Sequence, residues 1–298
     1  MKYATASAFK AALEARLRDR STEQHLPLPR LRKILVFERL LARLFIIAPD
    51  RWVVKGGVAL DFRMGDRARS TKDLDLVRQG SVAAANADML ALQTIDLGDY
   101  FTFTIEPIPA RKATGETVSA RFRALAELDD RRFEMVTIDV GFDYSFVNSP
   151  DHLESHNFLE FAGVPPLQIP ALPLERHLAE KLHAYTRTYV GGLASSRVKD
   201  LVDIVLIGSI AAFRAGRLRR EIEATFAERA THDIPASLPP PPATWHDQFH
   251  LLATEVDLNP NLDVGYKHAA ELFDPVLRDS TDEEAVWDAT AWEWRVTT

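Results

Sequence analysis

The sequence predicts a mixed α/β (α+β) fold, in which N-terminal helices precede a mixed β-sheet core and a mainly helical lobe follows. Apolar residues recur at helical spacing before residue 50, form short strand-like runs between residues 51 and 145, and return to helical spacing beyond Pro173. The chain of 298 residues is long enough for about two domains. We place these domains at residues 1–150 and 151–298.

The core elements follow in order along the chain. After Pro29, leucines and isoleucines recur at helical spacing between basic residues, which indicates an amphipathic helix. Residues 52–54 are typical of a short buried strand, and Gly56 and Gly57 end it where a helical turn begins. Further strands are expected at four runs rich in alternating, β-branched or aromatic residues, namely 72–77, 100–108, 118–125 and 133–140.

The C-terminal lobe changes period. Its apolar residues predict four helices, at 174–185, 198–206, 245–255 and 262–277. The run from Pro239 to Pro242 fits neither a helix nor a central strand, because proline lacks the backbone N–H that both need. We therefore expect a stiff, Pro-rich extended connector at 235–244.

Composition narrows the class of protein. Hydrophobic residues make up 46% and charged residues 27% of the chain, as in an ordinary globular protein. The absence of cysteine excludes disulfides, thiolate metal sites and cysteine nucleophiles. No apolar run approaches the roughly 20 residues of a membrane span, and the amphipathic N-terminus does not look like a secretory signal. We therefore expect a cytoplasmic protein without membrane segments.

Charge is unevenly distributed around a net value of -7. Residues 1–43 contain ten Lys or Arg against four Asp or Glu, whereas the tail after His250 contains eleven acids and three bases. Such asymmetry fits a basic face for a phosphate-rich partner, and it fits solvated helix faces equally well. The candidate RNA-binding residues come from two basic stretches: Arg30, Arg32, Lys33, Arg39, Arg214, Arg217, Arg219 and Arg220.

Asp73 and Asp75 are the most informative feature. They alternate with two leucines on a predicted strand, so both carboxylates lie on one face. Carboxylates this close invite a divalent cation to offset their repulsion, and Mg²⁺ is the natural choice. Exposed strands also carry such pairs by chance, so the motif alone does not establish a metal site.

A glycine pair precedes these acids. Gly56 and Gly57 end a strand and open a helix, where backbone N–H groups can approach a phosphate and the helix dipole favours negative charge. A plain tight turn is the alternative interpretation. Strand, glycine pair, helix and D-x-D strand together predict a nucleotide held by its phosphates beside a two-metal site.

These motifs resemble a known family. K-G-G-x-A-L at 55–60 and R-x-R-S-T-K-D-L-D-L at 67–76 are similar to the polymerase-β-type minimal nucleotidyltransferases, specifically the AbiEii/MenT family of toxin enzymes. The distance from the glycines to D-x-D is longer than is usual in the superfamily, and this spacing is similar to the AbiEii branch. The resemblance implies a polymerase-β-type nucleotidyltransferase core, with the active site expected in a cleft between the two lobes.

The resemblance also implies a third carboxylate on a neighbouring strand. Asp139, in V-T-I-D-V-G-F, is the best candidate because it follows alternating apolar residues on a predicted strand. Asp143 is the fallback. With Asp73 and Asp75, Asp139 would bind two Mg²⁺ ions.

Two C-terminal motifs extend the resemblance. E-K-L-H-A at 180–184 and R-V-K-D-L-V-D at 197–203 resemble the family's helical lysine motif and its later R/K-D-x-x-D motif. The resemblance makes Lys181 a triphosphate ligand, oriented by Asp200 and Asp203, with Lys72 and Arg197 as further cations. Without it, these residues would be ordinary surface charges.

The implied activity is the transfer of nucleotides from an NTP to the 3′ end of tRNA. The NTP would be CTP or another pyrimidine triphosphate. This transfer would block aminoacylation and translation, and it implies a cognate antitoxin encoded nearby. Two alternatives stay open: adenylylation of a protein or of a small molecule such as an antibiotic, and a catalytically inactive nucleotide- or RNA-binding module. The preferred NTP, the acceptor and the oligomeric state are not fixed by the sequence.

Overall fold

The structure is a computed structural model that describes residues 2–109, 120–142, 149–187 and 197–296. The chain divides into two compact units, Met1–Leu172 and Pro173–Thr298. None of the described helices combines the length and apolarity that a bilayer-spanning helix requires.

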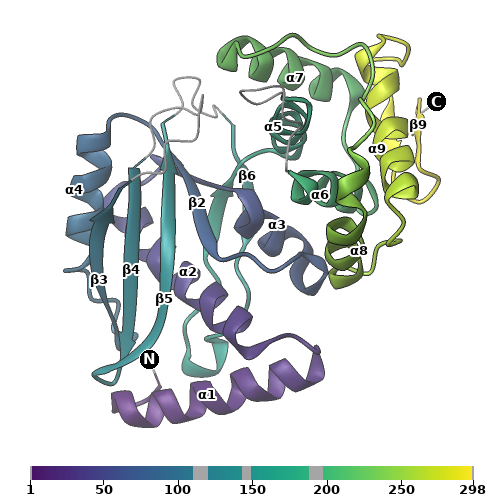
Figure 1. The fold of residues 1–298 in the computed structure, drawn as a ribbon. Helices are drawn as coiled ribbons and strands as arrows, with labels where there is room; N and C mark the ends of the chain where they lie inside the picture. The colour runs from purple at the N-terminus through teal and green to yellow at the C-terminus, as the bar shows by residue number, and fades with distance from the viewer. Residues whose placement is uncertain (1, 110–119, 143–148, 188–196, 297–298) are drawn as a thin grey trace. The chain divides into compact units, whose positions relative to one another are not determined.

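A seven-stranded mixed sheet forms the centre of the first unit (Figure 1), with strand order β3-β4-β5-β2-β1-β7-β6. Its strands are β1 (Trp52–Lys55), β2 (Asp73–Arg78), β3 (Phe101–Ile108), β4 (Ala120–Leu128), β5 (Arg131–Gly141), β6 (Asp151–Glu154) and β7 (Gln168–Ala171). Strand β2 pairs parallel with β5 and antiparallel with β1, so the strand that carries D-x-D lies inside the sheet.

Helices cover one face of this sheet. They are α1 (Ala6–Glu23), α2 (Leu28–Ile47) and α4 (Val82–Leu92), while α3 (Gly56–Met64) and the short 3-10 turn η1 (Gly65–Arg67) connect β1 to β2. Leu35 and Leu40 of α2 are fully buried in one core with Leu74 of β2 and Ile138 of β5. Burying each such side chain stabilises the fold by about 1.5–3 kcal/mol.

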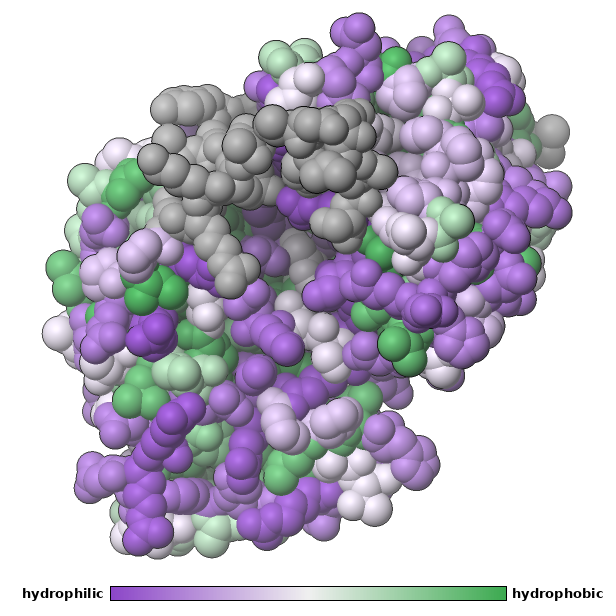
Figure 2. Space-filling model, in the orientation of Figure 1, coloured by the Kyte–Doolittle hydropathy of each residue, from purple (hydrophilic) through white to green (hydrophobic). Residues whose placement is uncertain are grey.

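The opposite face of the sheet carries the polar residues. Thr102, Thr104 and Glu106 of β3 are exposed, in alternation with buried aromatic and aliphatic residues. In Figure 2 the surface over β3, β4 and β5 mixes hydrophilic and hydrophobic residues. The period-2 pattern of these strands therefore separates a helix-covered core face from an open polar face.

The second unit is mainly helical. Its elements are α5 (Leu174–Thr186), α6 (Val198–Gly208), α7 (Ala215–Arg229), η3 (Ala243–Trp245), α8 (His246–Glu255), α9 (Leu262–Leu277), and the hairpin of β8 (Val286–Asp288) with β9 (Glu293–Arg295). Trp287 of the hairpin is 1% exposed and donates a 2.8 Å hydrogen bond from Nε1 to the Gly208 carbonyl. The late tryptophan therefore serves the core of this unit.

The five predicted strands and four predicted C-terminal helices are present. Residues 231–242, which cover most of the Pro-rich connector predicted at 235–244, contain no helix or strand, and η3 begins at Ala243. The division between the two compact units falls at Leu172, whereas the predicted domain boundary is at residue 150. Strand β7 pairs with β1, and β6 pairs with β7. Residues 151–172, which include η2 (Glu160–Ala162), therefore belong to the first unit.

Candidate active site

Four charged residues form one row across four neighbouring strands of the first unit. The strand register places Lys55 opposite Asp75, Asp75 opposite Asp139, and Asp139 opposite Arg121. Residues paired in this way are close neighbours on one face of a sheet. The row therefore has two adjacent acids between two bases, and Asp73 lies on the same face of β2, two residues before Asp75.

The apolar residues of these strands explain why the acids face outward. Leu74 and Leu76 are completely buried, which turns the alternating aspartates of β2 to the open face. Ile138 does the same for Asp139 on β5. The side chains of Asp73 and Asp139 are 43% and 35% exposed, so a ligand can reach them.

Arg121 approaches the acids from β4. Its Nε lies 3.1 Å from Asp139 Oδ1 and its Nη2 lies 3.8 Å from Asp73 Oδ1, and the side chain is 15% exposed. The shorter contact is an ion pair that lacks the alignment of a hydrogen bond. The guanidinium therefore neutralises part of the acidic charge without being tightly fixed to either carboxylate.

The glycine pair brings the first turn of α3 against this cluster. Gly56 has φ +63°, and a Cβ built on it would lie only 2.1 Å from Asp75 Oδ2. A Cβ on Gly57 would lie 2.9 Å from the Thr71 side chain. Both positions need glycine because the backbone approaches these side chains so closely. A plain tight turn would not require the backbone to approach Asp75 so closely. The local geometry therefore supports a binding site at this turn.

Buried ion pairs hold α3 in place. Asp61, which is 1% exposed, accepts a 2.9 Å bond from Arg30 Nη2 and contacts His156 Nε2 at 2.8 Å. Arg30 also donates to the Gly65 carbonyl at the end of α3. These bonds tie the helix with the glycine pair to α2 and to the segment after β6. Arg30 is thus internal, and its assignment to an RNA-binding face is wrong.

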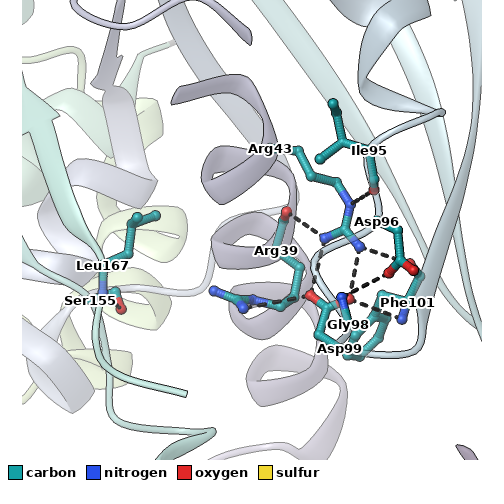
Figure 3. A network of polar contacts seen from close by, with 9 residues as sticks. All are labelled: Arg39, Arg43, Ile95, Asp96, Gly98, Asp99, Phe101, Ser155 and Leu167. Carbon is teal, nitrogen blue, oxygen red and sulfur yellow. Dashed lines mark hydrogen bonds and ion pairs between the residues drawn. The ribbon is translucent and has the colours of Figure 1, made fainter. Parts of the chain in front are cut away.

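The same correction applies to Arg39. Its Nη1 lies 3.5 Å from Asp99 Oδ2 at 6% side-chain exposure, next to Arg43, which binds both oxygens of Asp99 (Figure 3). Helical spacing predicted Arg39 on a polar surface because the sequence shows no nearby acid on that face. Its partner comes from the segment before β3, about 60 residues away along the chain, so this helix is buried even on its charged side.

The remaining basic candidates are less deeply buried, and most have acidic neighbours. Arg32 is 30% exposed and pairs with Glu14, and Lys33 is half-buried. In the second unit, Arg214, Arg217 and Arg219 pair with Glu284, Glu175 and Asp279, respectively. Arg220 is exposed. Acidic partners therefore offset much of the basic charge that the sequence suggested.

A second ionic cluster lies inside the helical unit. Lys181 Nζ on α5 lies 2.6 Å from Asp203 Oδ2 and 3.4 Å from Asp200 Oδ1 on α6, with side-chain exposures of 7%, 0% and 12% for the three residues. Arg197 caps the start of α6, 3.9 Å from Asp200, and is 42% exposed. The alternative interpretation of Lys181 and the two aspartates as surface charges is wrong.

The predicted site residues thus gather in two places. Asp73, Asp75 and Asp139 come together in the first unit, with exposed Lys72 immediately before β2. The lysine and two aspartates of the helical lobe come together in the second unit. A shared cleft between the lobes stays a prediction. The fallback residue Asp143 lies outside the described residues.

The carboxylates suit a divalent cation by their donor chemistry. Three side chains with oxygen donors share one partly exposed sheet face, and Mg²⁺ prefers oxygen ligands. Arg121 already brings a positive charge to two of them. Within the described part of the chain, no three metal-ligating side chains converge closely enough to form a finished metal site. The donor types of the cluster therefore suit a cation, and in this structure they do not converge on one point.

Lys55 and Arg121 were not among the predicted site residues. Lys55 is the first letter of the glycine motif, and register places it opposite Asp75. Arg121 and Arg123 alternate with buried Phe122 on β4, in the same period-2 pattern that singled out the two aspartates. That pattern places Arg121 on one face of its strand, but only strand order reveals that the face is shared with Asp139.

Comparison with known proteins identifies a family that matches this chain. Residues 39–296 match the family described as "Nucleotidyl transferase AbiEii toxin, Type IV TA system". No curated protein matches the chain significantly. The structure is similar to the nucleotidyltransferase toxin MenT4 from Mycobacterium tuberculosis H37Rv, with 15% identity and a TM-score of 0.56, covering 94% of this chain and 92% of that one. JHP933 from Helicobacter pylori shows 15% identity and a TM-score of 0.46, covering 83% and 94%, respectively.

The family match spans most of the chain, and the similarity to MenT4 shows a shared fold. The predicted nucleotidyltransferase fold and the predicted family are therefore confirmed. A cognate antitoxin follows from the type of system that the family describes. This chain belongs to the AbiEii family and is a nucleotidyltransferase toxin of a type IV toxin–antitoxin system.

Proposed function

We propose that this toxin acts in the cytoplasm and transfers nucleotides from CTP or another pyrimidine triphosphate to the 3′ end of tRNA, which blocks aminoacylation and translation. The observation that carries the proposal is the register of Asp75 with Asp139, beside Asp73 and the glycine-opened end of α3. Adjacent acids next to a helix N-terminus suit a reaction between a phosphate-bearing nucleotide and a hydroxyl.

The first unit supplies the reacting centre. Asp73, Asp75 and Asp139 would hold two Mg²⁺ ions, and such ions would supply activation of the acceptor hydroxyl and charge compensation for the pyrophosphate. The backbone N–H groups that follow Gly56 and Gly57 face the phosphates of the nucleotide. Most of the rate then comes from positioning and charge neutralisation.

The second unit supplies a fixed cation. Asp203 and Asp200 of α6 both pair with the Lys181 ammonium, so this cation is held by buried partners. Lys181 contacts the triphosphate in this proposal, and Lys72 and Arg197 add positive charge. A lysine acts here as a compact point charge rather than as a bidentate clamp.

The acceptor is an RNA in this proposal because cations remain on the surface after the buried arginines are removed from the original set. Arg32, Lys33 and Arg220 keep some exposure, and Arg214 and Arg217 are ion-paired but partly exposed. Phosphate contacts of this kind make binding weaken as salt rises.

One assay tests the proposal. Purified protein is incubated with total RNA, Mg²⁺ and each labelled NTP in turn, with EDTA and the Asp75→Asn protein as matched controls. We expect label at the 3′ end of tRNA, strongest with a pyrimidine nucleotide, and none in either control. Label on a protein or a small molecule instead would favour the adenylylation alternative, and the absence of transfer with every NTP would favour a binding module.

A further inference from the structure

Arg121 occupies the acidic cluster in a way that the proposed reaction does not use. Its guanidinium lies between Asp139 and Asp73, at 3.1 Å and 3.8 Å from their nearest oxygens. We propose that Arg121 is an internal counter-ion of these carboxylates, which competes with the divalent cation and is displaced when the cation binds. This inference rests on the metal site of the proposed function.

Arg121 and a divalent cation would compete for the same carboxylate oxygens. The row across the sheet places two acids side by side, with Lys55 next to one and Arg121 next to the other. Without a cation, the guanidinium reduces repulsion between the acids. A divalent cation on the same oxygens would lie within a few ångströms of the guanidinium, where like charges repel strongly. The two cations therefore cannot both hold their preferred positions.

The ion pair is built loosely enough to exchange. The 3.1 Å contact lacks hydrogen-bond alignment, and the second contact is longer. The acids are 35% and 43% exposed, so water can replace the guanidinium as it leaves. By contrast, Lys181 in the second unit is 2.6 Å from an acid with no exposure. The exposure of Asp73 and Asp139 suits a replaceable cation rather than a permanent structural pair.

Arg123 provides a matched control on the same strand. It is two residues from Arg121 and shares its face of β4, but register places it between Thr137 of β5 and Glu106 of β3, away from Asp73, Asp75 and Asp139. It is exposed, whereas Arg121 is 15% exposed. Changing Arg123 removes the same charge from the same face of the protein without touching the ion pairs with Asp139 and Asp73.

The test measures metal binding directly. Metal-free protein is titrated with Mn²⁺ and the free ion is followed by electron paramagnetic resonance, for the wild type, Arg121→Gln, Arg121→Lys and Arg123→Gln. We expect Arg121→Gln to bind Mn²⁺ about tenfold more tightly, a Coulombic gain reduced by the exposure of the site. Arg121→Lys should stay near the wild type because it keeps the charge, and Arg123→Gln should also change little.

Thermal unfolding supplies a second readout. Without metal, Arg121→Gln should melt below the wild type, since Asp139 and Asp73 lose a counter-ion, and saturating Mn²⁺ should raise its Tm by more than it raises the wild-type Tm. Arg121→Met, which also removes the charge, replaces the glutamine variant if that protein does not fold.

Unchanged or weaker Mn²⁺ binding by the neutral variants would overturn the counter-ion role and indicate that Arg121 instead positions Asp139. The two proposals fail separately. Tighter Mn²⁺ binding without nucleotide transfer to any acceptor would reject the proposed function alone, whereas transfer with unchanged Mn²⁺ affinity would reject the counter-ion alone.

Discussion

The two ionic clusters of this protein use similar residue types in different surroundings. In the first unit, Asp73 and Asp139 keep 43% and 35% of their side-chain surface exposed and share one arginine, at 3.8 Å and 3.1 Å, respectively. In the second, Lys181 lies 2.6 Å from Asp203, which has no exposed surface. One cluster has excess negative charge at an open surface, and the other is closed around its own cation.

This difference in exposure predicts different roles for the two clusters. An open acidic cluster can take up and release a cation, because its charges keep contact with water. A closed pair lost hydration when the protein folded, so removing one partner leaves the other as a buried, uncompensated charge. We therefore expect substitutions in the first cluster to affect activity more than stability, and substitutions in the second to affect stability first.

The largest expected effect is on activity in the open cluster. Asp75→Asn should reduce nucleotide transfer at least about a thousandfold, since it removes a ligand of the reacting centre. Its Tm should change little or rise, because the change removes one of three neighbouring negative charges. Transfer assays and thermal melts check this together. Activity within tenfold of the wild type would contradict the role of the cluster.

The next effect is on stability in the closed cluster. Lys181→Ala should lower the free energy of unfolding by about 3–5 kcal/mol, because Asp203 remains buried without its partner. The double variant Lys181→Met with Asp203→Asn should recover much of this loss, as measured by denaturant unfolding.

That double variant also isolates the catalytic contribution of the lysine. If Lys181 contacts the triphosphate, the folded double variant should transfer nucleotides about 30- to 1,000-fold more slowly than the wild type. Activity within about threefold of the wild type would mean that Lys181 is purely structural, and the proposed roles of Asp200 and Asp203 would lose their support.

Much of the fold could be predicted because its strongest signals are local. Strand alternation around Leu74 and helical spacing in 262–277 each depend on neighbours within a few residues, and both elements are present. Strands β6 and β7 could not be predicted in this way. They have four residues each and gain their place through pairing, β7 with β1 and β6 with β7, and such pairing leaves little trace in a short sequence window.

The candidate site also has parts that could be predicted from local sequence and parts that could not. D-x-D and the glycine pair are local motifs, and the structure places Gly56 against Asp75 as close neighbours. The burial of Arg30 and Arg39 could not be predicted, because their partners Asp61 and Asp99 come from distant segments. Arg121 needed the order of strands. A charged residue in a sequence needs a partner if it is buried. Only the tertiary fold shows which residue that partner is.

The two ends of α3 carry glycines with similar backbone angles and different surroundings. Gly56 and Gly65 lie at opposite ends of α3 with φ +63° and +62°, but a Cβ on Gly65 would meet nothing within 4 Å, whereas one on Gly56 would meet Asp75 at 2.1 Å. Alanine at either position should cost about 1–2 kcal/mol from backbone strain. Only Gly56→Ala should also reduce transfer, by about tenfold or more, because it displaces a carboxylate of the reacting centre. Equal activities of the two variants would remove Gly56 from the site.

The smallest expected effect is a difference in pH dependence between the units. In the first unit, burial raises the pKa of Glu38 well above its ordinary value. In the second, burial lowers the pKa of His183 to about 3. A carboxyl that stays protonated when folded loses stability as pH rises, because the unfolded chain ionises first. A histidine that stays neutral when folded loses stability as pH falls below about 6.5, because the unfolded chain binds the proton first.

The two units should therefore respond to pH in opposite directions. Relative to the wild type, Glu38→Gln should gain more in Tm at pH 8 than at pH 5, and His183→Gln should gain more at pH 5 than at pH 8. The histidine effect is bounded at about 1.4 kcal/mol per pH unit below pH 6.5. Melting curves of the three proteins between pH 5 and pH 8 measure both slopes. Parallel slopes for the two variants would show that burial does not hold Glu38 and His183 in opposite neutral states.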